Sequence, residues 1–229
     1  MEKYSKEFMP TSEEIYFNRI QELSKIKILI IGESPYPNGA NGVAFCKNSW
    51  DELFEGKEIL EEGEKKRCCG QDVLYSLGFE EEKVRSKFKS PIHLWIYMLE
   101  RGVVMINIAH NILSDEFILG QTTEAYTEAL FKANQETILK SKALNYPIIE
   151  KSDELFILGE LAAKCIFNHC YTDFKDKPRE VLIHPSIRGK ISKNKEKHHE
   201  WSETWGEKYL LRKIKPKMCL PVASFPRKD

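Results

Sequence analysis

A serine and a histidine, residues that can act together in acyl transfer, each follow a run of β-branched residues in this sequence. They are Ser34 and His184. A serine nucleophile of this kind needs the turn G-x-S-x-G, in which the second glycine permits a sharp bend from strand to helix. Tyr36 stands where that glycine should be, and a rigid proline, Pro35, follows the serine directly. The spacing therefore disfavours a serine hydrolase and directs attention to other chemistry at the same positions.

Motifs for nucleotide cofactors and metals are missing from the sequence. No G-K-[S/T] phosphate loop occurs, and no G-x-G-x-x-G follows a hydrophobic run. The six cysteines form no C-x-x-C pair and no zinc-ribbon spacing, and adjacent cysteines rarely bridge each other or share a metal. We therefore expect no metal, no iron–sulfur cluster, no cofactor, and reduced thiols at Cys46, Cys68, Cys69, Cys165, Cys170 and Cys219.

Hydrophobic runs of strand length end in polar or glycine-containing segments at four places. The run 27–31 leads into an irregular loop from Gly32 to Gly42, 103–106 ends at Asn107, 155–158 ends at Gly159 and Glu160, and 181–183 ends at His184. Runs of this kind are typical of strands buried on both faces of a parallel sheet. Because ligands of such sheets bind beyond the carboxyl ends of the strands, the sequence predicts a site at these four endings.

Helical patterns separate the predicted strands. A capping-box sequence at Thr11–Glu14 begins a helix that runs to about Ser24, and further helices are predicted from Ser49, from Ser90-Pro91, over Thr123 to about Lys142, over Leu161–Asn168 and over His199 to about Ile214. Strands that alternate with helices indicate an α/β fold. We predict a three-layer αβα architecture with a central four-stranded parallel sheet, formed by one domain over residues 1–229.

Composition excludes several classes of protein. The 229 residues are 41% hydrophobic and 31% charged, which does not fit a disordered or fibrous chain. No apolar run approaches the roughly 20 residues of a membrane span, and the first residues lack the apolar core of a signal peptide. We expect a monomer in the cytoplasm or associated with the nucleoid. The formal net charge is zero, but residues 176–229 hold 14 Lys and Arg against 7 Asp and Glu, which suits an anionic partner.

Four short motifs resemble those of one enzyme family. They are Gly32-Glu33-Ser34-Pro35-Tyr36-Pro37, Asn41-Gly42-Val43-Ala44-Phe45, Val103-Val104-Met105-Ile106-Asn107 and His184-Pro185-Ser186-Ile187-Arg188. They resemble, in the same order, the G-Q-D-P-Y-H, H-G-L-A-F, L-L-L-N and H-P-S-P-L motifs of the uracil-DNA glycosylase superfamily. The resemblance implies the fold of that superfamily. It also implies that the protein is a hydrolase that cuts the N-glycosidic bond of a flipped-out uracil or modified pyrimidine and leaves an abasic site.

The resemblance also implies roles for the residues around the base. His184 would donate a hydrogen bond to the base carbonyl oxygen that gains negative charge as the bond breaks. Phe45 would stack on the extruded base, Tyr36 would exclude bulk at C5, and the Asn107 amide would pair with the polar edge. An asparagine at a strand end can also serve only as a cap, and a phenylalanine can be an ordinary core residue.

Further positions resemble the loops that hold DNA, single- or double-stranded, by its backbone. Small residues and backbone N–H groups face phosphates there, and the family inserts a leucine into the base stack where this chain has arginine. A lysine-rich run follows, which suits phosphate contacts and a salt-sensitive affinity. The predicted DNA-binding residues are Pro35, Ser186, Ile187, Arg188, Lys190 and Lys193.

The sequence departs from the family at the catalytic acid, because Ser34 occupies the position of the family aspartate. Three interpretations remain open. In the first, Ser34 positions water while Glu33 or Asp115 supplies the negative charge. In the second, the protein acts on a modified base, as in damaged DNA or in hypermodified phage DNA attacked by antiviral defence. In the third, the protein binds DNA without catalysis. Under the first two, the predicted catalytic residues are Ser34, His184 and Glu33.

Overall fold

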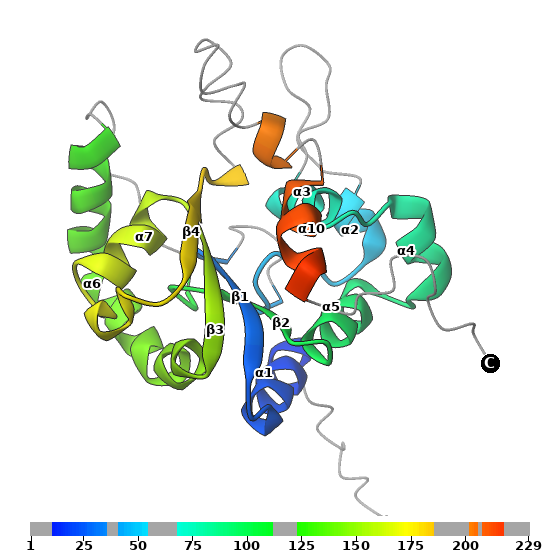
Figure 1. Cartoon of the computed structure of the whole chain (residues 1–229), viewed down its shortest axis with the longest axis horizontal. Helices are drawn as coiled ribbons and strands as arrows, with labels where there is room; N and C mark the ends of the chain where they lie inside the picture. The colour runs from blue at the N-terminus through cyan, green and yellow to red at the C-terminus, as the bar shows by residue number, and fades with distance from the viewer. Residues whose placement is uncertain are drawn as a thin grey trace, which may run out of the picture.

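Four parallel strands form the central sheet of the computed structural model, which describes residues 11–35, 41–54, 68–111, 123–185, 202–205 and 208–217. The strands are β1 (Ile26–Gly32), β2 (Val103–Asn107), β3 (Ser152–Leu158) and β4 (Arg179–Leu182), and their order across the sheet is β2-β1-β3-β4 (Figure 1). All neighbouring pairs are parallel. The predicted α/β fold with a four-stranded parallel sheet is confirmed.

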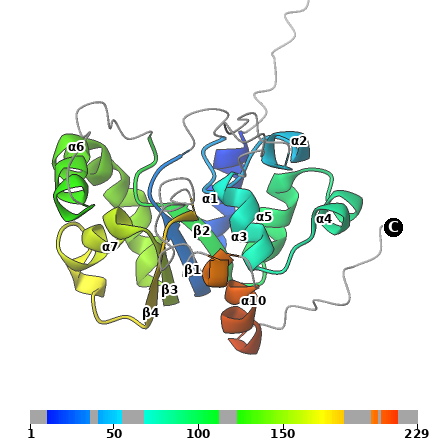
Figure 2. The same cartoon turned by 90° about the horizontal axis from the view of Figure 1, so that it is seen from above.

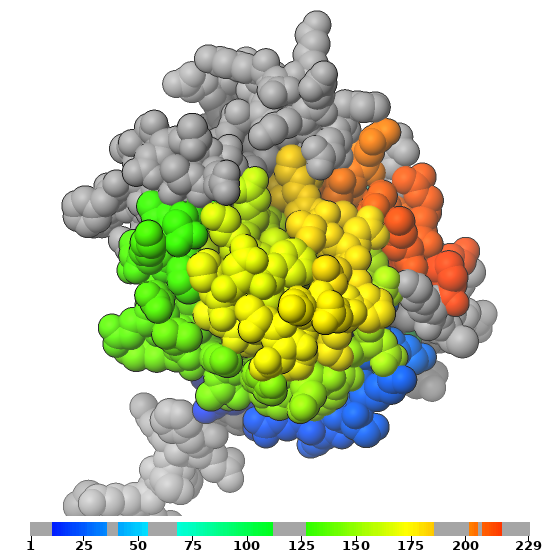
Figure 3. All heavy atoms as spheres, turned by 60° about the vertical axis from the view of Figure 1, so that its left-hand side comes forward, coloured from blue at the N-terminus to red at the C-terminus, as the bar shows by residue number. Residues whose placement is uncertain are grey.

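Helices cover both faces of the sheet (Figures 1 and 2). One face carries α6 (Thr123–Glu150) and α7 (Glu160–Phe167), which lie side by side in the space-filling view of Figure 3. The other side carries α1 (Ser12–Glu22) and α5 (Pro91–Leu99), together with the shorter α2 (Trp50–Phe54), α3 (Cys69–Ser76), α4 (Glu81–Lys87) and α10 (Tyr209–Ile214). Two 3₁₀ turns, η1 (Thr172–Phe174) and η3 (Lys215–Lys217), complete the described elements.

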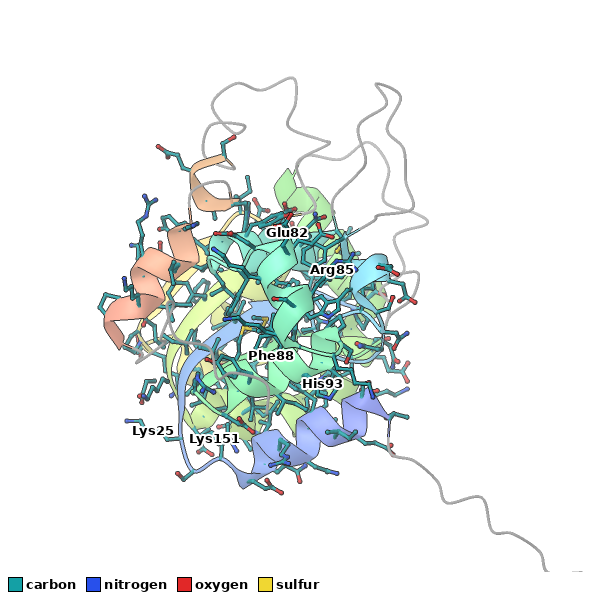
Figure 4. The ribbon with its side chains drawn as sticks, turned by 90° about the vertical axis from the view of Figure 1, so that its right-hand side faces the viewer. Lys25, Glu82, Arg85, Phe88, His93 and Lys151 are labelled. Atoms are coloured by element: carbon teal, nitrogen blue, oxygen red, sulfur yellow. The ribbon has the colours of Figure 1, made fainter. Side chains whose placement is uncertain are left out.

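The first helix closes the outer edge of the sheet. The predicted capping box is present, since Thr11 Oγ1 accepts from the Glu14 amide and Glu14 Oε2 accepts from the Thr11 amide. One face of α1 buries Tyr16, whose hydroxyl accepts the Met105 amide at 2.9 Å on the free side of β2. At the other end of α1, Lys151 Nζ donates to the carbonyls of Ile20 (2.6 Å) and Leu23 (2.9 Å). Figure 4 shows Lys151 close to this helix. One amide of the edge strand β2 and two carbonyls at the end of α1 thereby gain a partner.

The longest helix extends beyond its predicted end. The sequence predicted a stop near Lys142, but α6 runs to Glu150 and contains Pro147. Proline removes one helical donor; the helix continues because Asn145, Ile148 and Ile149 beyond the predicted stop are buried. No helix in the described part of the chain is both long and apolar enough to cross a membrane.

Other predicted boundaries shift at the ends of elements. The strand predicted from Leu155 begins at Ser152, and the one predicted over 181–183 covers Arg179–Leu182. The prediction of a single helix from His199 to about Ile214 is wrong where the structure describes these residues. Residues 202–205 form a helical turn, and α10 begins only after Lys208, whose φ of 56° does not belong to a helix. The short helices α3 and α4 were not predicted, because their seven or eight residues carry too few apolar periods to stand out.

Alkaline pH should destabilise this core. Burial raises the pKa of Cys46 from 9.0 to about 12 and raises the pKa of Tyr16 as well. Between these two pH values the folded chain keeps a proton that the unfolded chain has lost. The contribution of Cys46 to the free energy of unfolding is therefore complete below pH 9.0 and is lost progressively as the pH rises to about 12. Each such group steepens the fall by up to about 1.4 kcal/mol per pH unit. Urea unfolding measured from neutral to alkaline pH checks this, and an unchanged slope in Cys46→Ala would contradict it.

Candidate functional site

Gly32, the last residue of β1, forms a gap in which two predicted base-binding residues meet. A Cβ atom at Gly32 would lie 2.5 Å from Phe45 Cζ and 2.7 Å from Asn107 Oδ1, both closer than atoms can approach. Gly32 pairs with Asn107 in the register of β1 and β2. The aromatic ring and the amide therefore share the space above this glycine, and both side chains are more than nine-tenths buried.

Gly159, which follows β3, brings together two more predicted residues. A Cβ atom there would lie 3.2 Å from His184 Cβ and 3.1 Å from Glu33 Cδ, and it would overlap Glu33 Oε1. The φ of this glycine is 95°, a value that other residues rarely adopt. Its amide donates to the Leu182 carbonyl at 2.9 Å, which continues the pairing of β3 with β4 toward His184. An acid and a histidine thus flank the end of the neighbouring central strand.

The loop that carries Phe45 is held in a strained conformation. Phe45 has a φ of 60° and is only 6% exposed. A left-handed non-glycine residue costs about 1–3 kcal/mol and persists only where its surroundings hold it. Here the buried Trp95 donates from Nε1 to the Ala44 carbonyl at 2.9 Å, and Asn41 Oδ1 accepts the Val43 amide at 3.2 Å. The ring is therefore oriented by the scaffold rather than by chain preference.

Two carboxylates, those of Glu33 and Asp72, contribute to the raised pKa of one cysteine thiol. The pKa of the Cys69 thiol is raised by burial first, then by Cys68 and by the charges of Asp72 and Glu33. The pKa of Cys165 is raised by its hydrogen bond with Cys170 and by burial, with a smaller contribution from Glu33. Asp72, on α3, is only 3% exposed and was not identified from the sequence, since one acid in a short helix carries no pattern. Glu33 and Asp72 thus both act on the same thiol.

The structure covers only part of the predicted site. Ser34 and Pro35 follow Glu33 directly and are half-buried. Six predicted site residues lie outside the described residues, namely Tyr36, Ser186, Ile187, Arg188, Lys190 and Lys193, and so does the alternative acid Asp115. Among the described members, Glu33, Phe45, Asn107 and His184 come from four separate segments and lie against Gly32 and Gly159 at the ends of the two central strands.

Other parts of the described structure offer weaker candidates. Among the described residues, no group of three or more His, Cys, Asp or Glu side chains could hold a metal ion. A shallow hollow of about 430 Å³ is lined by Lys27, Asp153, Glu154 and Pro178 at the opposite, amino-terminal ends of the strands. Its lining lacks the aromatic ring and amide that meet at Gly32. The carboxyl edge of the sheet is therefore the better candidate.

Comparisons with known proteins give structural neighbours at low similarity. Wild-type UNG from Nitratifractor salsuginis is 17% identical with a TM-score of 0.40, and the match covers 86% of this chain and 78% of that chain. A point mutant of the same protein is 18% identical with a TM-score of 0.37, over 85% and 78%. No protein-family model and no curated protein matches the sequence. Likeness at this level leaves the function to be inferred from the residues of this chain.

The gap above Gly32 should not tolerate a methyl group. Gly32→Ala forces Phe45 and Asn107 to move, and overpacking of this kind costs about 1–3 kcal/mol of unfolding free energy. In a Phe45→Ala background the ring is absent, so the same substitution should cost clearly less. Urea unfolding of the single and double variants measures both costs, with Ile30→Val as a buried control in the same strand. Equal costs of Gly32→Ala in both backgrounds would show that the ring does not fill this space.

Proposed function

We propose that this protein is a DNA glycosylase that hydrolyses the N-glycosidic bond of a flipped-out uracil or modified pyrimidine. The observation that carries the proposal is the convergence of Phe45, Asn107, Glu33 and His184 on two glycines at the ends of the central strands. Phe45, Asn107 and His184 each match a residue of a motif of the uracil-DNA glycosylase superfamily, whereas Glu33 stands where the family motif has glutamine. The ends of parallel strands always lie together, so the specific support is that residues of three separate motifs pack against the same two glycines there.

The pair at Gly32 suits recognition of a pyrimidine. An aromatic face offers stacking to a base removed from the helix, and an amide offers one donor and one acceptor to its polar edge. Both side chains are buried, so their hydrogen bonds and contacts are made in a site from which water is largely excluded. We assign the stacking to Phe45 and the reading of the polar edge to Asn107.

The pair at Gly159 suits charge separation. As the bond between C1′ and the base nitrogen breaks, its electron pair goes to the base, and the sugar becomes an oxocarbenium ion. A histidine N–H can stabilise the anionic base, and a carboxylate can stabilise the cationic sugar and accept a proton from the attacking water. We assign the first role to His184 and the second to Glu33, with Ser34 as a hydroxyl that orients the water.

DNA contact by the basic carboxyl-terminal quarter completes the proposal. Residues 176–229 carry 14 Lys and Arg against 7 Asp and Glu, and this part of the chain begins beside β4 and contains His184. Phosphate contacts of this type weaken as salt rises because they release counterions. We propose that Pro35, Ser186, Ile187, Arg188, Lys190 and Lys193 hold the strand from which the base is extruded.

Incubation with labelled oligonucleotides, followed by alkali, tests the activity. The panel carries uracil, thymine mismatches, hydroxymethylcytosine, glucosyl-hydroxymethylcytosine and oxidised pyrimidines. We expect cleavage at one of these bases and a loss of about 100-fold in His184→Ala, because a charge-stabilising donor is removed. The matched control is His93→Ala, which removes an exposed histidine of α5 that bonds Ser90 Oγ (Figure 4). Silence on every base would contradict the proposal, and so would equal loss in both variants.

The source of the negative charge can be tested by moving the carboxylate from position 33 to position 34. Glu33→Gln should lower excision by about tenfold to 100-fold, and Ser34→Asp should raise it in the parent and restore most of it in Glu33→Gln. Single-turnover excision of the base identified by the panel measures both effects. If Asp72→Asn reduces the rate more than Glu33→Gln does, the assignment of the charge to Glu33 is wrong.

A non-catalytic DNA-binding protein is the second candidate, and the replacement of the family aspartate by Ser34 favours it. In that case the panel gives no cleavage, but salt-sensitive binding to DNA persists. Retention of Phe45, Asn107 and His184 together at the sheet edge supports catalysis instead, because binding to the DNA backbone needs none of these three side chains.

A further inference from the structure

Two side chains of α6 satisfy the backbone of the segment that follows β2. Asn145 Nδ2 donates to the carbonyls of Asn107 at 3.0 Å and of Ile108 at 3.2 Å, and Ser141 Oγ accepts the His110 amide at 2.9 Å. On the other side, the Ile108 amide donates to the carbonyl of Gly32, the last residue of β1, at 2.8 Å, and the Ala109 amide donates to the carbonyl of Glu33 at 3.0 Å. The chain that carries Asn107 is therefore held between β1 and α6.

The orientation of the Asn145 amide follows from these contacts. Asn145 is fully buried, and the two backbone carbonyls that it faces can only accept hydrogen bonds. Nδ2 must therefore face the carbonyls, and Oδ1 then faces His110 Nε2 at 2.8 Å. An amide oxygen only accepts, so Nε2 of His110 carries hydrogen in this arrangement. The His110 ring packs on Phe17, with centroids 5.0 Å apart, which fixes its plane.

We propose that Asn145 is a positioning residue for Asn107 and that His110 orients Asn145 by donating from Nε2. The inference rests on the proposed function in so far as Asn107 reads the base. The physical reason is that the bonds from Asn145 to the carbonyls of Asn107 and Ile108 fix the backbone from which the Asn107 side chain projects. Without Asn145, two buried carbonyls lose their donor, and unsatisfied groups of this kind drive the backbone to rotate.

Little rotation can be tolerated at this point. Asn107 Oδ1 lies 2.7 Å from the place that a Gly32 Cβ atom would take, so the amide is close against the end of β1. A side chain that must meet a base edge within hydrogen-bond range has a tolerance of well under 1 Å. Asn145 of α6 therefore affects base recognition by fixing the position of Asn107, and it does not contact the base itself.

A double-mutant cycle separates positioning from general stability. We expect Asn145→Ala to slow single-turnover excision by about tenfold with unchanged DNA affinity. The double variant with Asn107→Ala should be no slower than Asn107→Ala alone, because the positioned group is already gone. The control is Asn134→Ala, which removes another buried asparagine of α6 whose Nδ2 donates to Leu130 O, within its own helix. Additive losses in the cycle, or an equal loss in the control, would overturn the inference.

The His110 arm keeps the test informative if Asn145→Ala does not fold. His110→Gln retains an N–H that can reach Asn145 Oδ1, whereas His110→Leu keeps similar bulk without a donor. We expect excision near the parent rate for the glutamine variant and a loss of several-fold for the leucine variant. Equal rates for the two variants would show that the donor from position 110 is not needed.

An NMR measurement tests the positioning role of Asn145 even if the protein excises no base. The side-chain NH₂ signals of Asn107, identified by their loss in Asn107→Ala, should shift in Asn145→Ala and stay in place in Asn134→Ala. Unchanged Asn107 signals in Asn145→Ala would overturn the positioning role. Catalytic failure with the expected shifts would instead contradict only the proposed function.

Discussion

Strand β1 pairs along one edge with β2 and along the other with β3, and four consecutive residues, Ile28 to Ile31, are fully buried. A strand in this position has no freedom to slide, because a shift of one residue would turn every side chain to the opposite face. The register therefore determines which residues stand at the sheet edge. It places Gly32 beside Asn107, and its continuation along β3 brings Glu33 to Gly159. The geometry of the candidate site is a consequence of that pairing.

The sequence was sufficient for the parts of the fold that local patterns determine. The runs 27–31 and 103–106 are hydrophobic at every position but Lys27, and each is followed by the residue that ends its strand, Gly32 or Asn107. The end of α6 could not be read in the same way. Asn145, Tyr146 and Pro147 resemble a helix stop, yet Asn145 is stabilised by carbonyls nearly 40 positions earlier in the chain, a contact that no window of sequence contains. Long-range satisfaction of a polar group outweighs local preference there.

The candidate site was partly accessible from the sequence for a related reason. Motif resemblance pointed to Phe45, Asn107, Glu33 and His184, but it could not say that two glycines create the space between them. It also missed Asp72 and Asn145, whose neighbours come from other elements. A residue whose role depends on contacts with distant segments can be recognised in the structure but hardly from the sequence around it. Ser34, which stands where the resembling motif has aspartate, is the converse case: the difference is plain from the sequence, but its effect depends on the charges that the fold places around it.

The two halves of the site differ in how they are attached to the scaffold. Asn107 belongs to a strand whose continuation is bonded to both β1 and α6, whereas His184 lies two residues beyond the four-residue edge strand β4, in which Val181 is 47% exposed. Local opening requires little free energy where few buried contacts and backbone bonds are broken. On the histidine side such bonds are present, since the Gly159 amide donates to the Leu182 carbonyl and Trp205 Nε1 donates to the Ile183 carbonyl at 3.1 Å. The two sides of the site are thus anchored independently, one through β1 and α6 and the other through β3 and the indole of Trp205, so each side can be loosened by substitution without removing the bonds that hold the other.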